Sequence, residues 1–224
     1  MKNSRWFICF DFETDGKKAE ECSPVELAAV PIDPETLEIR RACAFSTVIR
    51  PPGIDKEDYF DDKKVETINW HAKQAGCTFD DIVEKWKGGM AQKTAWKNFC
   101  SYCSKYNVDK RPGQWYPQPI PVGYNILGYD MIIAERLAEK HKAKVPFSQV
   151  TRVDIFDMIF TWFENLDEPS DFKMDTLRKF FGIKSEGKAH SAIVDVFEEA
   201  EIFVKFMKFQ RRQASVKKFK GSFA

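Results

Sequence analysis

Two carboxylates that follow an apolar run have the clearest potential for chemistry in this sequence. Asp11 and Glu13 come directly after the apolar residues 6–10, a run that predicts a strand buried on both faces. Because side chains alternate along a strand, both carboxylates project from one face and Phe12 points the other way. Their repulsion and lost solvation would be offset by a hard divalent cation such as Mg²⁺ or Mn²⁺. An ordinary Asp-containing turn after the strand is the alternative interpretation.

A third acid lies at the start of a predicted helix. Residues 121–130 predict a short strand, a glycine-containing turn and a helix start. The apolar positions three, four, seven and eight residues after Asp130 share its helical face: Ile133, Ala134, Leu137 and Ala138. Asp130 therefore occupies the first turn of the buried face, where an apolar residue would be expected. Capping of the helix N-terminus is the alternative to metal binding, because Asp is favourable there.

The third candidate segment holds His190 and Asp195 and leads into an amphipathic helix. One apolar stripe runs along that helix: Ile193, Val196, Phe197, Ala200, Phe203, Val204 and Met207. Five residues correspond to about 140° around a helix, so His190 and Asp195 cannot share a helical face. We expect His190 on the preceding loop, Ser191 near the cap and Asp195 in the first turns. A loop histidine suits a general base, although a surface histidine is the simpler interpretation.

In their order and spacing these motifs resemble the DEDDh subgroup of the DnaQ-like 3′–5′ exonuclease superfamily. The motifs are Asp11-x-Glu13, Asn125-x₄-Asp130 and His190-x₄-Asp195, and the resemblance extends over roughly residues 5–208. Four further segments resemble the family's second, third and fifth strands and the helix before the last motif: Val25–Ile32, Cys43–Ile49, Arg152–Asp157 and Met174–Ile183. Residues 123–125 and 189–192 are similar to bacterial exonuclease I-type members, which digest single-stranded DNA.

The resemblance implies a role for each matching residue. Two divalent cations, Mg²⁺ or Mn²⁺, would be held by four ligands: Asp11, Glu13, Asp130 and Asp195. Such ions lie about 3.5–4 Å apart and clamp the attacking and leaving oxygens at phosphorus. His190 would accept the proton of the attacking water, and the product would be a 5′-mononucleotide. The positions of Thr14 and Asn125 contact the terminal nucleotide or brace the site in relatives, and Tyr124 lies where a base could stack. Asp154 has no spacing that places it in the site and is expected to be structural.

Length and composition predict one intracellular enzyme domain. The 224 residues, 43% of them hydrophobic, are enough for a full core. No stretch approaches the ~20 apolar residues of a membrane span, and the N-terminal apolar run is too short for a signal peptide. Six scattered cysteines predict reduced thiols, so we expect a cytoplasmic protein. The resemblance to bacterial exonuclease I-type members implies that a bacterium or a phage encodes it. Cys100-x-x-Cys103 lacks the second pair that a zinc site would need.

The charge distribution predicts a local rather than a general attraction to nucleic acid. A formal net charge of +1 is not that of a protein that coats DNA. The clearest basic patch is at the C-terminus: Arg211, Arg212, Lys217, Lys218 and Lys220. We therefore expect an exonuclease domain over residues 1–209 and a basic tail over residues 210–224. The tail either contacts phosphates or is a frayed, solvated end.

Together these patterns predict an α/β ribonuclease H-like fold with a mixed central β-sheet flanked by α-helices. The expected function is a metal-dependent 3′–5′ exonuclease on the 3′ end of single-stranded nucleic acid, with DNA favoured over RNA. An oligoribonuclease-like or RNA-trimming enzyme is the main rival. A non-catalytic nucleic-acid-binding module on the same fold belongs to another class, and the presence of all five catalytic positions argues against it. The sequence leaves polymerase and replication or repair partners open.

Overall fold

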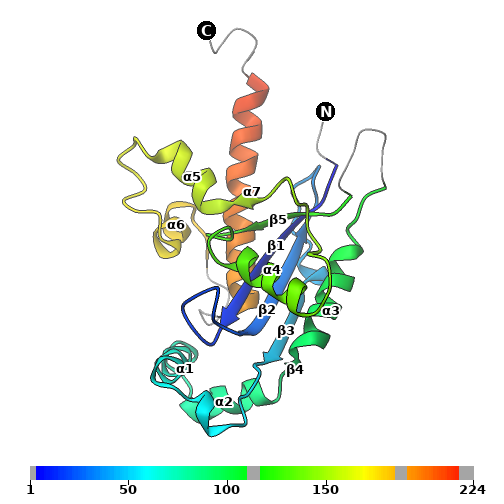
Figure 1. The fold of residues 1–224 in the computed structure, drawn as a ribbon. Coiled ribbons are helices and arrows are strands. Elements are labelled where there is room, and N and C mark those ends of the chain that lie inside the picture. Colours follow the sequence, from blue (N-terminus) through cyan, green and yellow to red (C-terminus); the bar gives the residue numbers. More distant parts are fainter. Residues whose placement is uncertain (1–3, 110–116, 185–190, 217–224) are drawn as a thin grey trace.

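A mixed β-sheet forms the centre of the protein. The computed structural model describes residues 4–109, 117–184 and 191–216 (Figure 1). Within them the sheet has the strand order β4-β3-β2-β1-β5-β6. The strands are β1 (Phe7–Thr14), β2 (Pro24–Ile32), β3 (Phe45–Arg50), β4 (Met90–Ala91), β5 (Ile120–Gly123) and β6 (Val153–Asp154). β2 is antiparallel to β1 and to β3, whereas β5 is parallel to β1 and β6 to β5. The predicted mixed sheet is confirmed.

Helices cover both faces of this sheet. They are α1 (Asp62–Ala75), α2 (Phe79–Lys87), α3 (Gln92–Ser104), α4 (Asp130–Lys140), α5 (Ile155–Phe163), α6 (Met174–Phe180) and α7 (Ala192–Val216). α7 runs along one face against β1 and β2, and α3 and α4 cover the other. α1 and α2 pack together near the end of the sheet to which β1 points, and α5 and α6 lie beside α7 (Figure 1). No helix in the described part of the chain is long and apolar enough to cross a membrane.

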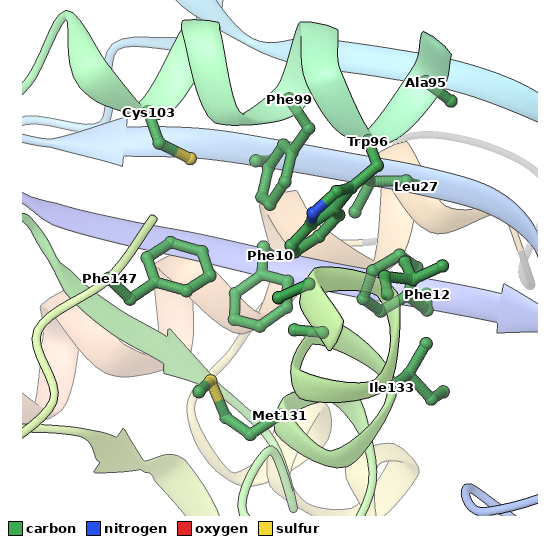
Figure 2. Close-up of a cluster of buried hydrophobic side chains, with 14 of the residues drawn as sticks. Phe10, Phe12, Leu27, Ala95, Trp96, Phe99, Cys103, Met131, Ile133 and Phe147 are labelled. Atoms are coloured by element: carbon green, nitrogen blue, oxygen red, sulfur yellow. The ribbon is translucent and has the colours of Figure 1, made fainter. Parts of the chain in front are cut away.

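The two faces of β1 are packed against different helices. Phe7 and Cys9 belong to the core beneath α7, and Ile8, Phe10 and Phe12 belong to the core beneath α3 and α4. Figure 2 shows the second core, in which Phe10 lies among aromatic side chains that descend from α3 and from the segment after α4. Its ring stacks on Phe147 with a centroid separation of 4.7 Å. The alternation that orders these side chains places Asp11 and Glu13 in the row of Phe7 and Cys9, on the α7 side.

The structure differs from the predicted bounds of several elements. The helix expected over Met174–Ile183 ends at Phe180. The predicted fifth strand contracts to β6, because the Asp154 carboxylate accepts a hydrogen bond from Phe156 N at 2.9 Å and caps α5. The third strand begins at Phe45 instead of Cys43, which ends a short 3₁₀ helix, Arg41–Cys43. The segment after β3 forms α1, which carries Trp70.

The last helix extends into the predicted basic tail. α7 continues to Val216, and the Arg211 guanidinium donates to the carbonyl oxygens of Pro34 and Glu35 at 2.8 and 2.9 Å. Arg211 thus ties α7 to the turn after β2. Lys217, Lys218 and Lys220 lie outside the described residues, and the boundary at residue 209 stays a prediction.

Candidate active site

Three of the predicted metal ligands meet at the end of β1. Asp11 and Glu13 come from β1, and Asp195 comes from the first turn of α7. Each offers one carboxylate oxygen, and these oxygens all lie within 4.8 Å of one another. The alternation along β1 and the early helical position of Asp195 were both predicted from the sequence. α7 brings them together by packing along the Phe7 and Cys9 side of the strand.

Asp130 reaches the same end of β1 at the edge of the strand that faces β5. β5 pairs with β1 only along Phe7–Cys9, so the edge of β1 beyond Cys9 has no strand partner on that side. The Phe12 amide donates to the Asp130 carboxylate at 2.9 Å. Asp130 is the first residue of α4 and is only 5% exposed. The side chain therefore completes the sheet edge and brings a buried fourth carboxylate near the other three, which are half-buried.

All four carboxylates have raised pKa values. Burial is the largest cause of a raised pKa in each of them, and in most of them neighbouring carboxylates raise it further. The pKa is raised to about 8 for Glu13, to about 7 for Asp130, to about 6 for Asp195, and well above its usual range for Asp11. An oxygen-only ligand set with excess buried negative charge fits hard divalent cations. The residues present therefore suit Mg²⁺ or Mn²⁺.

Glu199 is a fifth buried carboxyl that the sequence analysis missed. It lies one helical turn after Asp195 on α7 and is 6% exposed. The amide of Tyr124 donates to its carboxylate at 3.2 Å, and the Cys9 sulfur lies 3.8 Å from the same oxygen. Burial and the charge of Asp130 raise the pKa of Glu199 well above its usual range. Its position on the apolar stripe of α7 was the available signal.

Arg178 on α6 supplies a positive charge at the edge of the ligand set. Its guanidinium lies 3.0 Å from Asp195 Oδ1 and 2.5 Å from Glu198 Oε2. The contact favours the ionised form of Asp195 and lowers its pKa, against the larger effect of burial. Arg178 thereby orients one predicted metal ligand from outside the cluster. The sequence analysis placed α6 before the last motif but assigned no role to this residue.

A cavity of about 300 Å³ opens next to Glu13. Its walls come from the end of β1, from α1 and from the residue before α4, and include Thr14, Trp70, His71 and Tyr129. His71 Nε2 lies 2.9 Å from the Thr14 carbonyl oxygen, and its Nδ1 lies 4.0 Å from Glu13 Oε2. The Tyr129 hydroxyl donates to Gly16 O at 2.8 Å and lies 2.7 Å from Thr14 Oγ1. Thr14 is therefore held from two sides at the mouth of the cavity.

The turn after β5 contains the other predicted substrate contacts. The Tyr124 hydroxyl donates to the carbonyl of Phe172 at 2.6 Å, so this side chain braces the segment before α6. Asn125 is exposed and has a left-handed backbone with φ 53°. The amides of Asn125 and Leu127 donate to the Asp154 carboxylate at 3.0 and 3.1 Å. Asp154 is thus structural, as predicted, because it fixes this turn and caps α5.

His190 lies outside the described residues. The structure begins again at Ser191, whose carbonyl accepts hydrogen bonds from the amides of Val194 and Asp195. The role of His190 as a general base therefore stays a prediction from the sequence.

Comparison with solved structures identifies the fold. The nuclease domain of 3′hExo, a DEDDh family member solved with bound rAMP, superposes with a TM-score of 0.63 at 16% identity, covering 92% of each chain. The chain has the fold of this nuclease domain. E. coli exonuclease I in complex with a dT13 oligonucleotide gives 0.67 at 17% identity, and cell-death related nuclease 4 (CRN-4) gives 0.66 at 13%. The predicted ribonuclease H-like fold and the resemblance to exonuclease I-type domains are confirmed at the level of the fold.

The match covers the present chain more fully than it covers some of these proteins. The alignment includes 94% of this chain but 43% of the exonuclease I chain, and 92% of this chain but 64% of CRN-4. A scan against models of protein families and a search of curated protein sequences both find no match.

Proposed function

We propose that this chain is a metal-dependent 3′–5′ exonuclease that releases 5′-mononucleotides from the 3′ end of single-stranded DNA. The observation that carries the proposal is the convergence of Asp11, Glu13 and Asp195 within 4.8 Å, with Asp130 beside them. This convergence lies at the end of the central strand of a fold shared with DEDDh nucleases. The exonuclease I structure with bound dT13 supports single-stranded DNA as the substrate class.

The four carboxylates would hold two divalent ions, Mg²⁺ or Mn²⁺. When bound, the ions supply an activated water and stabilise the charge that develops on the leaving 3′-oxygen. Asp11 and Glu13 on a rigid central strand fix the positions of their oxygens, and Arg178 fixes Asp195. The raised pKa values of the ligands mean that metal binding releases protons from the site.

His190 is proposed as the general base that accepts the proton of the attacking water. In the sequence it comes two residues before Ala192, where α7 begins, and five before the proposed ligand Asp195. An imidazole with an ordinary pKa near neutrality can accept this proton at working pH.

The terminal nucleotide is proposed to enter the cavity next to Glu13. Trp70 is 42% exposed on its wall, so a base can stack on the indole. Thr14 lines the same space, and its contacts with His71 and Tyr129 keep it in place without a ligand. Preorganisation of this kind lowers the cost of positioning the scissile phosphate.

Degradation of matched oligonucleotides tests the proposal. A 5′-labelled DNA single strand should give a ladder that shortens from the 3′ end with Mg²⁺ or Mn²⁺ and no products in EDTA. A 3′-labelled strand should release mononucleotide at once, and Asp195→Asn should be inactive on both substrates. Saturable binding without products under every metal condition would contradict the proposal and favour a non-catalytic binding module.

RNA of the same sequence distinguishes the principal alternative. The 3′hExo domain was solved with rAMP, so one protein with this fold binds a ribonucleotide. Faster cleavage of RNA than of DNA in the same assay would replace DNA by RNA as the proposed substrate and leave the nuclease assignment intact. Duplex DNA provides the third comparison, and we expect slower cleavage than for the single strand.

A further inference from the structure

α1 forms one wall of the cavity next to Glu13, yet it packs mainly against α2 rather than against the strands (Figure 1). Its buried apolar residues Ile68 and Ala72 belong to a small core cluster that includes Trp86 of α2. This cluster is distinct from the two cores on the faces of β1. The position of the α1 wall relative to the metal ligands therefore depends on individual contacts between α1 and the end of β1.

His71 on α1 makes a buried contact with the end of β1. A carbonyl oxygen only accepts hydrogen bonds, so His71 Nε2 donates to the Thr14 carbonyl, at 2.9 Å. The other ring nitrogen, Nδ1, lies 4.0 Å from Glu13 Oε2, and the His71 side chain is 8% exposed. A second contact, the ion pair of Lys17 with Glu66, is formed by exposed side chains and is screened by water. The buried hydrogen bond therefore has the larger influence on the position of α1.

The His71 ring also contacts the indole that forms the exposed part of the wall. Trp70, the preceding residue, meets the His71 ring edge to face, with a centroid separation of 5.0 Å and an interplanar angle of 77°. The buried Trp86 of α2 meets the same ring at 5.4 Å and 80°. Edge-to-face packing of this kind favours a defined ring orientation. His71 therefore links the surface on which a base can stack to the strand that carries the metal ligands.

We propose that His71 is a positioning residue that makes productive binding depend on an intact base at the 3′ end of the substrate. The inference rests on the proposed function and adds a substrate requirement to the same site. A terminal base that stacks on Trp70 is held at a fixed distance from the metal ligands, because His71 ties Trp70 to the Thr14 carbonyl. A 3′ end without a base has no π face to stack, so its scissile phosphate loses this positioning.

Two 5′-labelled DNA single strands that differ only in the last residue test the proposal. One ends in thymidine and the other in a tetrahydrofuran residue, an analogue of a nucleotide without its base. The rate of the first cleavage is measured with Mg²⁺ or Mn²⁺, and binding of both strands is measured in EDTA by fluorescence anisotropy. We expect the full chain to favour the thymidine end about tenfold in kcat/KM and in affinity. Tenfold corresponds to about 1.4 kcal/mol, within the range of base stacking on aromatic side chains.

Two variants of His71 separate the hydrogen bond from the packing of the ring. His71→Leu removes the donor and keeps an apolar side chain against Trp86. It should reduce the preference for the thymidine end to about twofold, through a higher KM for that end and an unchanged rate on the abasic end. His71→Gln keeps an amide donor near the position of Nε2 and should restore most of the preference. Thermal unfolding shows that each variant is folded.

Tyr59→Phe is the matched control, because it removes another buried hydrogen bond at the end of β1. The Tyr59 hydroxyl donates to the Asp15 carboxylate at 2.8 Å from the segment before α1. Trp70 is the ninth residue of α1 and lies about 12 Å along the helix from its start. The control should therefore lower the melting temperature and leave the preference for the thymidine end within about twofold of wild type.

The cleavage and binding measurements separate failure of this inference from failure of the proposed function. Equal use of the two ends by the wild type overturns the role of His71 and leaves the exonuclease proposal standing. The same conclusion follows if His71→Leu keeps the full preference, or if it slows both ends equally, as a purely structural role would. A preference in binding that His71→Leu abolishes, without cleavage under any metal condition, supports the inference and refutes only the exonuclease proposal.

Discussion

The two faces of β1 show how one strand serves stability and chemistry separately. On the α3 and α4 side, Phe10 and Phe12 are at most 4% exposed and pack edge to face with a centroid separation of 5.9 Å. On the α7 side, Asp11 and Glu13 crowd their carboxylates against Asp195. Burial of the first face stabilises the folded protein, whereas burial of charge on the second face destabilises it.

This difference indicates that the aromatic face compensates for the carboxylate face. The buried carboxylates have raised pKa values and hold protons that they would release in water. Packing on the opposite side of the same strand therefore offsets the unfavourable free energy of a carboxylate site that suits cations. Functional sites commonly reduce stability in this way. Mutations on the two faces should consequently change different observables.

Removal of one metal ligand should have the largest effect, a loss of activity without a loss of stability. Asp11→Asn or Asp195→Asn should reduce nucleotide release to the background of the assay, because the cation loses a charged ligand. In EDTA the same variants should melt at or above the wild-type temperature, because a repelling charge is gone. Asp58→Asn, an exposed acid, is the matched control and should change neither value. Near-normal turnover of either ligand variant would refute the assignment of the carboxylate face.

His190→Ala should have the next largest effect on activity. We expect turnover to fall about 10²–10⁴-fold, the range for loss of general-base assistance. Metal titrations should give unchanged midpoints, because the residue is not a proposed ligand. The wild-type rate should rise with pH through the histidine titration, and the variant should lose that limb. An identical pH profile in the two proteins would count against His190 as the base.

A truncation in the aromatic core should change stability instead. Phe99 is a fully buried residue of α3 that contacts Phe10. Phe99→Ala should therefore lower the free energy of unfolding by about 3–5 kcal/mol. Turnover per folded molecule should stay close to wild type. Phe160→Ala removes the same atoms from a side chain that is 42% exposed and should cost about 1 kcal/mol or less. Equal losses in urea unfolding would contradict the division of roles between the two faces.

The smallest expected effect is the pH dependence of stability without metal. Because folding raises the carboxyl pKa values, the stabilisation from bound protons is complete below the ordinary carboxyl range. It is lost as the pH rises through about 6, 7 and 8, the values of Asp195, Asp130 and Glu13. In EDTA the melting temperature should therefore fall with rising pH. The free energy of unfolding should fall by on the order of a few kcal/mol, since one pKa unit corresponds to about 1.4 kcal/mol.

Two additions sharpen this measurement. Mg²⁺ should restore stability mainly at the alkaline end, where the ligands are ionised. Asp11→Asn should flatten the profile in EDTA, because it removes a coupled carboxylate. A flat wild-type profile would show that the carboxylate face is not under electrostatic strain.

Local sequence patterns determined most of the fold and the nearest parts of the site. The apolar run before Asp11 predicted a buried strand, and alternation along it placed Asp11 and Glu13 on one face. The spacing of apolar residues after Asp130 predicted a helix whose first residue is buried, as the structure shows. These inferences succeed because strand and helix periodicity depend on neighbouring residues alone.

Tertiary structure decided which distant groups support those ligands. His71 contacts the Thr14 carbonyl, 57 residues away in the sequence. Arg178 on α6 forms an ion pair with Asp195 on α7. The Glu199 carboxylate accepts a hydrogen bond from the Tyr124 amide, which follows the end of β5. No local pattern specifies such pairs, since the packing of α1, α6 and α7 around the sheet sets their separations. The sequence therefore determined which side chains could do chemistry, and the fold determined which groups hold them in place.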